Sequence, residues 1–431
     1  MNAATHDRNM VGATQADLAA AAASRRPRHV NELEPWYLMA VNFSSEGRDL
    51  RLDLFRGLAN WAIFLDHIPN NVVAWLTTRN YGFRDAADLF VFISGYTAAL
   101  AYSRTMSDSG FLAGAVRLAR RVWQLYVAHV LLFVFYIAAI GWVGQSYSHL
   151  HLLDEFNVAG LIAEPIAYLS QGLSLKFKPL NMDVLPLYIV LMAIFPVILR
   201  TMLSRPDATL ICSLVVYFAA RQFGWNLPAW PGGVWYFNPF AWQLLFVLGS
   251  WCVLGGKRTL RWLSASRSVL WLCAAYLALA LAVSVPQHFG LQVSVLPPWL
   301  SEQFASNDKT NLPPYRVLHF VALAVLTTYL IPGDRRWLSS WLRYPAMLCG
   351  RRSLEVFCVG IFLSFVAHFT LELVSASIWM QIVVSFCGIA IMTGVAWVRS
   401  WSIGAGGAKN EGRGGKKHVG TFVSDLNSKA A

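Results

Sequence analysis

Ten apolar segments follow one another along this chain, and each approaches the length of a helix that crosses a membrane. Such a helix needs about 20 predominantly apolar residues, because lipid offers no partner to backbone N–H and C=O groups. The chain is 56% hydrophobic and 13% charged, whereas soluble domains carry about 25% charge. The sequence therefore predicts an all-α, polytopic integral membrane helix bundle with about ten transmembrane helices. The predicted segments are 52–76, 86–103, 122–143, 183–203, 208–223, 239–255, 268–286, 316–331, 353–373 and 376–398.

Lysine and arginine are distributed unevenly between the loops, and this predicts how the helices are oriented in the membrane. With the N-terminus in the cytoplasm, most of the 35 lysines and arginines fall on the cytoplasmic side, as the positive-inside rule requires. Both termini are therefore expected in the cytoplasm. The net charge of +12 is then a topological signal, and it does not indicate a nucleic-acid partner. The basic residues on the predicted outer side are Arg79, Arg84, Lys176, Lys178, Arg221, Lys309 and Arg316.

The composition divides the chain into three regions. Residues 1–47 are polar, without an apolar run long enough for a signal peptide, and we expect a largely disordered cytoplasmic segment. Residues 48–401 form the predicted membrane domain. Residues 402–431 are rich in Gly and Lys and are expected to be a flexible basic cytoplasmic tail that touches anionic lipid. The six cysteines have no C-x-x-C spacing, and we interpret them as small buried hydrophobic residues.

The first apolar segment carries more polar side chains than lipid tolerates. On a helical wheel with 100° per residue, Asp53, Arg56, Asn60 and His67 fall within about 60° of one another. Ionisable groups at this depth are costly unless they face a bundle interior or a cavity, so this polar stripe is expected to line a functional site. Pro69 is expected to bend or unwind the helix just past His67. The alternative, a polar helix buried for packing alone, remains open.

His67 is the strongest catalytic candidate, because imidazole is the side chain whose ordinary pKa, about 6.5, lies near neutrality. Its neighbour Asp66 is also a candidate, although adjacent helical residues point about 100° apart. Asp88 and Glu355, on other predicted helices, are equally good carboxylate partners for the imidazole. Glu355 is included among the catalytic candidates because a carboxylate inside a membrane span is typically paired or functional.

A second group of candidates concerns substrate binding. Arg56 lies about 16 Å from His67 by helical rise, near the predicted cytoplasmic boundary. Together with Arg120 and Arg121, at the start of the third segment, it is expected to bind a phosphate-bearing donor from the cytoplasm. Further polar candidates for donor or substrate binding are Asp53, Asn60, Asp88, Ser94 and Tyr96.

Two weaker patterns lie in the predicted outer loops. Trp225, Trp230 and Tyr236 crowd one loop, where they form either a carbohydrate platform or, more simply, the interfacial aromatic belt. His149 and His151 form a His-x-His pair without further ligands at matching spacing, so the sequence predicts no metal site. No Gly-rich phosphate loop or G-x-S-x-G elbow is present in the sequence.

Several long motifs, in the same order, resemble the OpgC family. They include RDLRLDLFRGLANWAIFLDHIPNNVVAW, DAADLFVFISGYTAAL and SLEVFCVGIFLSFVAHF, and the resemblance extends from about Arg48 to Trp401. The family comprises membrane proteins of Gram-negative bacteria that modify osmoregulated periplasmic glucans with succinyl groups. Its larger relatives, the acyltransferase type 3 membrane enzymes, have about ten helices and use a first-helix histidine; His67 occupies that place here.

The resemblance implies a multi-pass inner-membrane acyltransferase that moves succinyl from cytoplasmic succinyl-CoA onto glucose hydroxyls of periplasmic glucans. His67 would act as base or as a covalent acyl relay, and Tyr96, Ser94 or Asn60 would donate to the oxyanion. No bound cofactor or metal is expected, because the acyl-CoA thioester supplies the driving force. The implied partners are acyl-CoA, the glucan and membrane lipid, with a second copy or glucan-synthesis proteins left open. A carrier or flippase without acyl chemistry, and a non-catalytic scaffold, are the alternatives.

Overall fold

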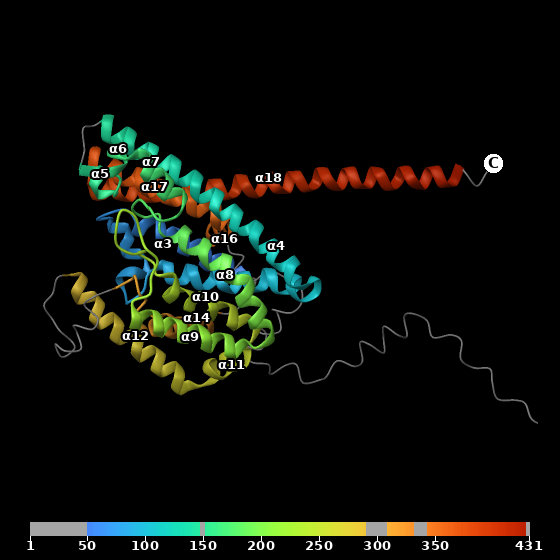
Figure 1. Ribbon diagram of the computed structural model, residues 1–431, viewed down its shortest axis with the longest axis horizontal. Coiled ribbons are helices and arrows are strands. Elements are labelled where there is room, and N and C mark those ends of the chain that lie inside the picture. The colour runs from blue at the N-terminus through green and yellow to red at the C-terminus, as the bar shows by residue number, and fades with distance from the viewer. Residues whose placement is uncertain (1–49, 147–150, 290–307, 332–342, 428–431) are drawn as a thin grey trace, which may run out of the picture. The chain divides into compact units, whose positions relative to one another are not determined.

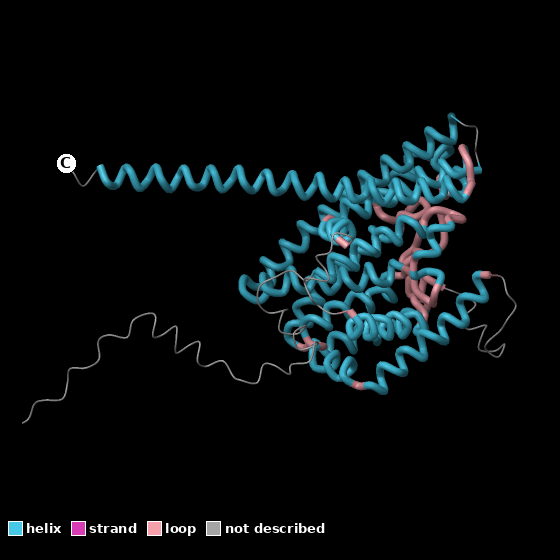
Figure 2. Tube along the Cα trace, turned by 180° about the vertical axis from the view of Figure 1, so that it is seen from behind, coloured by secondary structure: helices cyan, strands magenta, loops and turns pink. Residues whose placement is uncertain are grey.

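The computed structural model describes residues 50–146, 151–289, 308–331 and 343–427 (Figure 1). Within these ranges the chain is helical, and the one β-type pairing is an isolated bridge between Pro228 and Val234. Much of the loop structure gathers at one side of the helices (Figure 2). The predicted N-terminal segment 1–47 and His149 lie outside the described residues, as does the side chain of His151.

Each long helix overlaps one or two of the apolar segments of the sequence. They are α3 (Leu50–Asp66), α4 (Ala86–Ser146), α8 (Val184–Ser204), α9 (Pro206–Phe223), α10 (Pro239–Leu254), α12 (Arg267–His288), α14 (Pro314–Leu330), α17 (Ser353–Leu373) and α18 (Ile378–Asn427). The short elements are η1 (Val72–Leu76), η2 (Thr78–Asn80), α5 (His151–Glu155), α6 (Gly160–Ala163), α7 (Pro165–Leu173), α11 (Lys257–Ala265) and α16 (Tyr344–Arg351).

Five helices of the described chain are long and apolar enough to cross a membrane. They lie in α4, α8, α12, α17 and α18, and α10 with α11 adds a sixth if the pair, bent by 93°, is one span. The prediction of an all-α membrane protein is thus confirmed, although a count of about ten spans is not shown. Two predicted segments, 86–103 and 122–143, both fall in α4, which is kinked at Gly110 (φ 84°). Glycine accepts this backbone conformation without steric cost.

The first predicted segment, 52–76, is not one helix. The helix α3 ends at Asp66, and the chain then turns through Asn70 (φ 53°) into η1. The physical cause is Pro69, which has no N–H to donate to the carbonyl of Leu65 and whose ring crowds the preceding turn. The predicted break just past His67 is therefore present, and the prediction of a continuous span to residue 76 was wrong.

Two glycines allow helices to approach at backbone distance. A Cβ atom on Gly57 of α3 would collide with the carbonyl of Ala346 in α16, and one on Gly95 of α4 would collide with the carbonyl of Phe246 in α10. Small residues at such crossings are typical of membrane bundles, where close packing replaces the hydrophobic effect. They fix α3 and the start of α4, which bound the connecting segment 67–85 that carries much of the candidate site.

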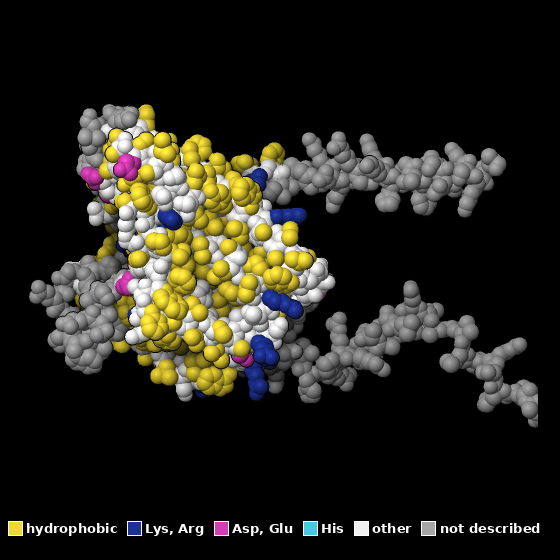
Figure 3. Space-filling view, in the orientation of Figure 1, with side chains coloured by type: hydrophobic (Ala, Val, Ile, Leu, Met, Phe, Trp, Pro, Cys, Tyr) yellow, Lys and Arg dark blue, Asp and Glu magenta, His cyan; other side chains and the backbone are white. Residues whose placement is uncertain are grey.

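The charged surface follows the distribution seen in the sequence. On the face shown in Figure 3, most Lys and Arg side chains lie toward one end of the helices and most Asp and Glu side chains toward the other. The last helix, α18, continues to Asn427, where a flexible tail was predicted from residue 402. Side chains beyond residue 402 lie outside the described part.

Candidate functional site

A cavity of about 840 Å³ with both polar and apolar walls lies where several helices begin or end. His67 follows the C-terminal end of α3, Ala86 begins α4, Val184 begins α8, and His368 lies near the end of α17. Loops that precede α8, α10 and α14 complete the wall. The site is therefore assembled at one end of the bundle from segments far apart in sequence. Its charged and amide side chains are Asp66, His67, Asn70, Asn71, Arg79, Asn80, Asp85, Asn181, Asp183, Lys309 and His368.

His67 is held in one orientation by the end of its own helix. Its Nδ1 lies 2.5 Å from the carbonyl oxygen of Ile63, and because a carbonyl only accepts, Nδ1 must carry the proton. Nε2 is then the nitrogen with the lone pair. Burial lowers the pKa of His67 below its ordinary value, and the hydrogen bond to Ile63 opposes this only in part. Burial therefore favours the neutral imidazole, the form in which a general base acts.

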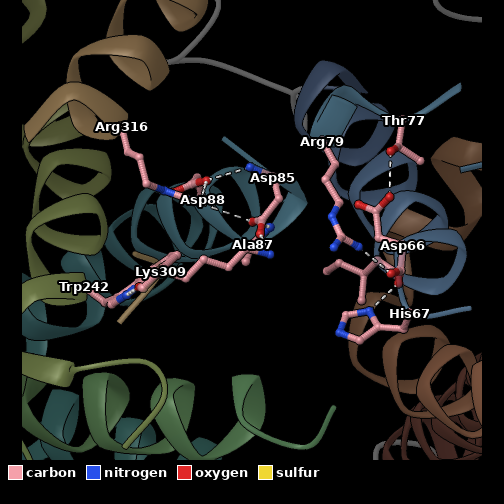
Figure 4. Close-up of polar contacts among 11 residues, drawn as sticks. Asp66, His67, Thr77, Arg79, Asp85, Ala87, Asp88, Trp242, Lys309 and Arg316 are labelled. Carbon is pink, nitrogen blue, oxygen red and sulfur yellow. Dashed lines mark hydrogen bonds and ion pairs between the residues drawn. The ribbon is translucent and has the colours of Figure 1, made fainter. Parts of the chain in front are cut away.

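Asp66 reaches the cavity but does not orient His67. Its Oδ1 accepts a hydrogen bond of 2.6 Å from Thr77 Oγ1, and its backbone carbonyl accepts one of 2.8 Å from Arg79 Nη1 (Figure 4). Thr77 Oγ1 is also 2.8 Å from the carbonyl of Ala74. Asp66 thus ties the segment between η1 and η2 back to the end of α3, and this segment forms one wall of the cavity.

Arg79 brings a cation to the same wall. Its guanidinium is anchored by the carbonyl of Asp66, and Figure 4 shows the side chain lying beside Asp66 and His67. The residue is exposed and lines the cavity. A guanidinium placed beside a neutral imidazole is suited to stabilise negative charge that develops during a reaction there.

A buried ion-pair cluster forms the floor at the start of α4. Asp85 and Asp88 make a reciprocal cap: Asp85 Oδ1 accepts from the N–H of Ala87 at 3.0 Å, and the N–H of Asp85 donates to Asp88 Oδ2 at 2.9 Å. This arrangement satisfies backbone donors that a helix start leaves without partners. Lys309 Nζ lies 2.6 Å from Asp85 Oδ2, and Arg316 Nη2 lies 2.8 Å from Asp88 Oδ2 (Figure 4).

The cations keep Asp85 ionised at the cavity wall. Burial alone would raise the pKa of Asp85, but Lys309 and Arg316 overcome this and hold the pKa below its ordinary value. Trp242 in turn holds Lys309 in place, because its Nε1 donates a 2.9 Å hydrogen bond to the backbone carbonyl of Lys309. Asp183 differs, because burial raises the pKa of this cavity-lining carboxyl to about 6.

The structure separates most of the predicted polar stripe from the cavity. Asp53 pairs with Arg351 at 3.5 Å, and Asn60 donates to Ser353 Oγ at 3.3 Å. Both side chains therefore join α3 to neighbouring helices. Packing accounts for this part of the stripe, while His67 alone of its four members reaches the cavity lining.

The remaining candidates also lie outside the cavity lining. Glu355 is paired with Arg399 at 3.4 Å, and Asp88 with Arg316, so in the described part of the chain neither serves as the partner of His67. Arg56 is half-buried on α3, and Ser94 is buried and Tyr96 half-buried on α4. Arg120 is exposed and Arg121 half-buried farther along α4.

Several cavity residues were not among the sequence candidates. They are Arg79, Asp85, Asp183, Lys309 and His368. A signal for two of them was available: Arg79 and Lys309 belong to the few basic residues on the predicted outer side, where the positive-inside rule disfavours them. A basic residue on the outer side, which the rule disfavours, is a better functional candidate than one on the cytoplasmic side.

The fold and the site define a helical membrane protein with a cavity at one end of its bundle, lined by a buried histidine and by the cations Arg79 and Lys309. The family model described as OpgC protein matches residues 48–403. The chain therefore belongs to the OpgC family, which is generally an acyltransferase family. This confirms the resemblance found in the sequence motifs. Searches of curated proteins and of solved structures gave no match.

Proposed function

We propose that this protein transfers an acyl group, succinyl from succinyl-CoA, onto glucose hydroxyls of osmoregulated periplasmic glucans. One observation carries the proposal: His67 lines the cavity with Nδ1 bound to the carbonyl of Ile63, so Nε2 is available to accept a proton. Membership of the OpgC family supports glucan modification as the setting. The protein would act in the bacterial inner membrane, with the cavity facing the periplasm.

The cavity lining suits a saccharide acceptor. Asn70, Asn181 and Asp183 offer amide and carboxylate groups that pair with sugar hydroxyls, and Trp75 and Tyr236 offer aromatic faces for sugar C–H surfaces. This mixture of a few polar groups and aromatic walls is typical of small-molecule sites. The glucan would enter at the loop end of the bundle.

In the proposed step, the oxygen of a glucose hydroxyl attacks the thioester carbonyl of acyl-CoA while His67 Nε2 accepts the hydroxyl proton. A carbon–oxygen bond forms, the carbon–sulfur bond breaks, and the CoA thiolate leaves and takes the proton from His67, which returns to its neutral form. Arg79 is placed to stabilise the oxyanion. It replaces Tyr96, Ser94 and Asn60 in this role, because those residues lie outside the cavity lining.

The donor would approach from the cytoplasmic side. Arg56, Arg120 and Arg121 are proposed to meet the phosphates of acyl-CoA, while the thioester extends along α3 toward His67. By helical rise the distance from Arg56 to His67 is about 16 Å. No ATP or resident cofactor is required in this scheme, because the thioester is already an activated acyl group.

The test measures succinyl content and net charge of periplasmic glucans from cells that lack this protein. The cells are complemented with wild type, with His67→Ala, or with Arg104→Gln, a control at an exposed residue of α4. At matched membrane abundance, wild type and Arg104→Gln should restore acidic esters, and His67→Ala should lower them by about 100-fold or more. Normal modification with His67→Ala would remove His67 from catalysis. Glucans unchanged by the deletion itself would favour a carrier or a scaffold.

A further inference from the structure

A second cluster of chemically reactive side chains lies at the edge of the same cavity. His368 Nε2 is 3.5 Å from Glu155 Oε1 and 3.5 Å from Glu372 Oε2. His368 and Glu372 are one turn apart on α17, and Glu155 ends the short helix α5. The acyl-transfer step proposed above uses none of these three residues.

The spacing of the cluster is poor for hydrogen bonding. An N–H···O hydrogen bond is about 2.7–3.2 Å long, whereas both contacts of His368 Nε2 are 3.5 Å. A single Nε2 carries at most one proton, so it cannot bond well to two carboxylates at once. Both contacts of His368 Nε2 are therefore longer than a good hydrogen bond and fall within ion-pair distance.

The same spacing fits a metal ion. Ligand atoms about 2.0–2.2 Å from a tetrahedral zinc lie about 3.3–3.6 Å from one another. All three ligand atoms of the cluster lie within 4.8 Å of one another, and both imidazole–carboxylate distances fall in the zinc range. Coordination by nitrogen together with carboxylate oxygen selects zinc-like transition metals over calcium or magnesium, which prefer oxygen alone.

The imidazole is held rigidly, which favours metal binding. His368 is 9% exposed, and its ring packs against Phe156 at a centroid distance of 5.2 Å and against Phe369 at 6.0 Å. The side chains of Glu155 and Glu372 are 41% and 28% exposed, so an ion can reach them from solvent. A fixed histidine with two accessible carboxylates is a partly preformed site.

We propose that Glu155, His368 and Glu372 bind one divalent transition-metal ion of the zinc class. The ion would fasten α5 to the end of α17 at the edge of the cavity, and its fourth position would hold water. This site goes beyond the proposed acyl transfer, and its role is to fix the cavity wall.

The experiment uses the full chain, purified in detergent, stripped with a chelator and titrated with Zn²⁺ alone. Calorimetry and elemental analysis should give one zinc per chain for the wild type. His368→Ala and the nearly isosteric Glu372→Gln should each weaken zinc binding at least tenfold. The control is Glu164→Gln, which removes an exposed carboxylate from the same peripheral segment and should bind zinc like the wild type.

The folding of each variant is checked by its elution volume and by its thermal midpoint without zinc. A wild type that binds no zinc at micromolar concentration would overturn the proposal, and so would wild-type affinity in both Glu372→Gln and His368→Ala. His67→Ala should bind zinc normally. Failure of the zinc site is thereby distinguished from failure of the acyltransferase proposal, which is read from the glucans.

Discussion

At the scale of single residues, the end of a helix determines the chemistry of His67. The last four carbonyls of a helix lack intrahelical partners, and the carbonyl of Ile63 accepts from both the backbone N–H and the Nδ1 of His67. Pro69 makes this possible because it ends the helix next to His67, so that the imidazole can turn back to the carbonyl of Ile63. The same local sequence that stops α3 therefore sets the tautomer of the proposed base.

The pKa of His67 leads to a prediction about pH. The base acts only when deprotonated, and burial lowers the pKa of His67 below its ordinary value of about 6.5. Activity should thus persist as pH falls through 6.5 and decline only at lower pH. The measurement is acyl transfer by reconstituted protein between about pH 4.5 and 8. The pKa of Asp183 is raised to about 6, so the variant Asp183→Asn shows whether this carboxyl contributes to the pH dependence. A pH–activity profile with its midpoint near 7 would contradict the assignment to His67.

Arg79 allows a second prediction at this scale. If its guanidinium stabilises the oxyanion, Arg79→Ala should lower kcat by about 100-fold or more while KM for the acceptor changes little. Arg79→Lys should be intermediate, because lysine keeps the charge but lacks the planar fork that binds the carbonyl of Asp66. Steady-state kinetics in proteoliposomes provides the measurement. A change confined to KM would show that Arg79 only binds substrate.

Of the site residues, the sequence could predict some and not others. His67 was predictable, because an ionisable side chain in an apolar segment is costly unless it is used. Asp53 and Asn60 carried the same signal, yet they serve packing contacts with Arg351 and Ser353. Periodicity locates a polar face, but it cannot distinguish a face that lines a cavity from one that bonds a neighbouring helix.

At the scale of elements, the start of α4 joins a helix cap to two ion pairs. Asp85 and Asp88 cap the helix, and the same carboxylates bind Lys309, in the segment before α14, and Arg316, in the first turn of α14. The sequence suggested a functional or paired Asp88, but its partner lies more than two hundred residues away. Element type was predictable from hydropathy, whereas such long-range pairing was not.

This pairing predicts a non-additive effect on stability. Asp88→Asn leaves the buried Arg316 without its closest carboxylate, and breaking a buried pair in this way costs about 3–5 kcal/mol. The double variant Asp88→Asn/Arg316→Met removes both charges and should be less destabilised than Asp88→Asn alone. Thermal unfolding of the purified variants in one detergent provides the comparison. Additive losses would show that the two residues act independently.

At the scale of the whole molecule, hydropathy alone accounts for the helical architecture, because only helices or closed barrels satisfy the backbone in lipid. The cavity has no comparable signature. Its wall combines the turn after α3, the start of α4 and the loops before α8, α10 and α14. Lys309 reaches it because its carbonyl is bound by Trp242 and because the neighbouring Thr310 carbonyl accepts from the N–H of Asn238. Such a site depends on tertiary contacts that no local pattern encodes.

The charge distribution of the whole chain leads to a last prediction, on orientation. Lys and Arg gather at helix ends away from the cavity, as in α8, where Val184 at the start lines the cavity and Arg200 and Arg205 lie at the other end. By the positive-inside rule that end should lie in the cytoplasm, so that the cavity opens to the periplasm. Asn70 lines the cavity and Arg258 lies at the start of α11, and both are exposed. In intact cells with a permeable outer membrane, Asn70→Cys should react with a membrane-impermeant maleimide, and Arg258→Cys should react only after the inner membrane is disrupted. The wild-type chain with its six native cysteines is the control. The reverse labelling pattern would show that the cavity faces the cytoplasm. Succinyl-CoA would then reach the cavity directly, with no passage along α3.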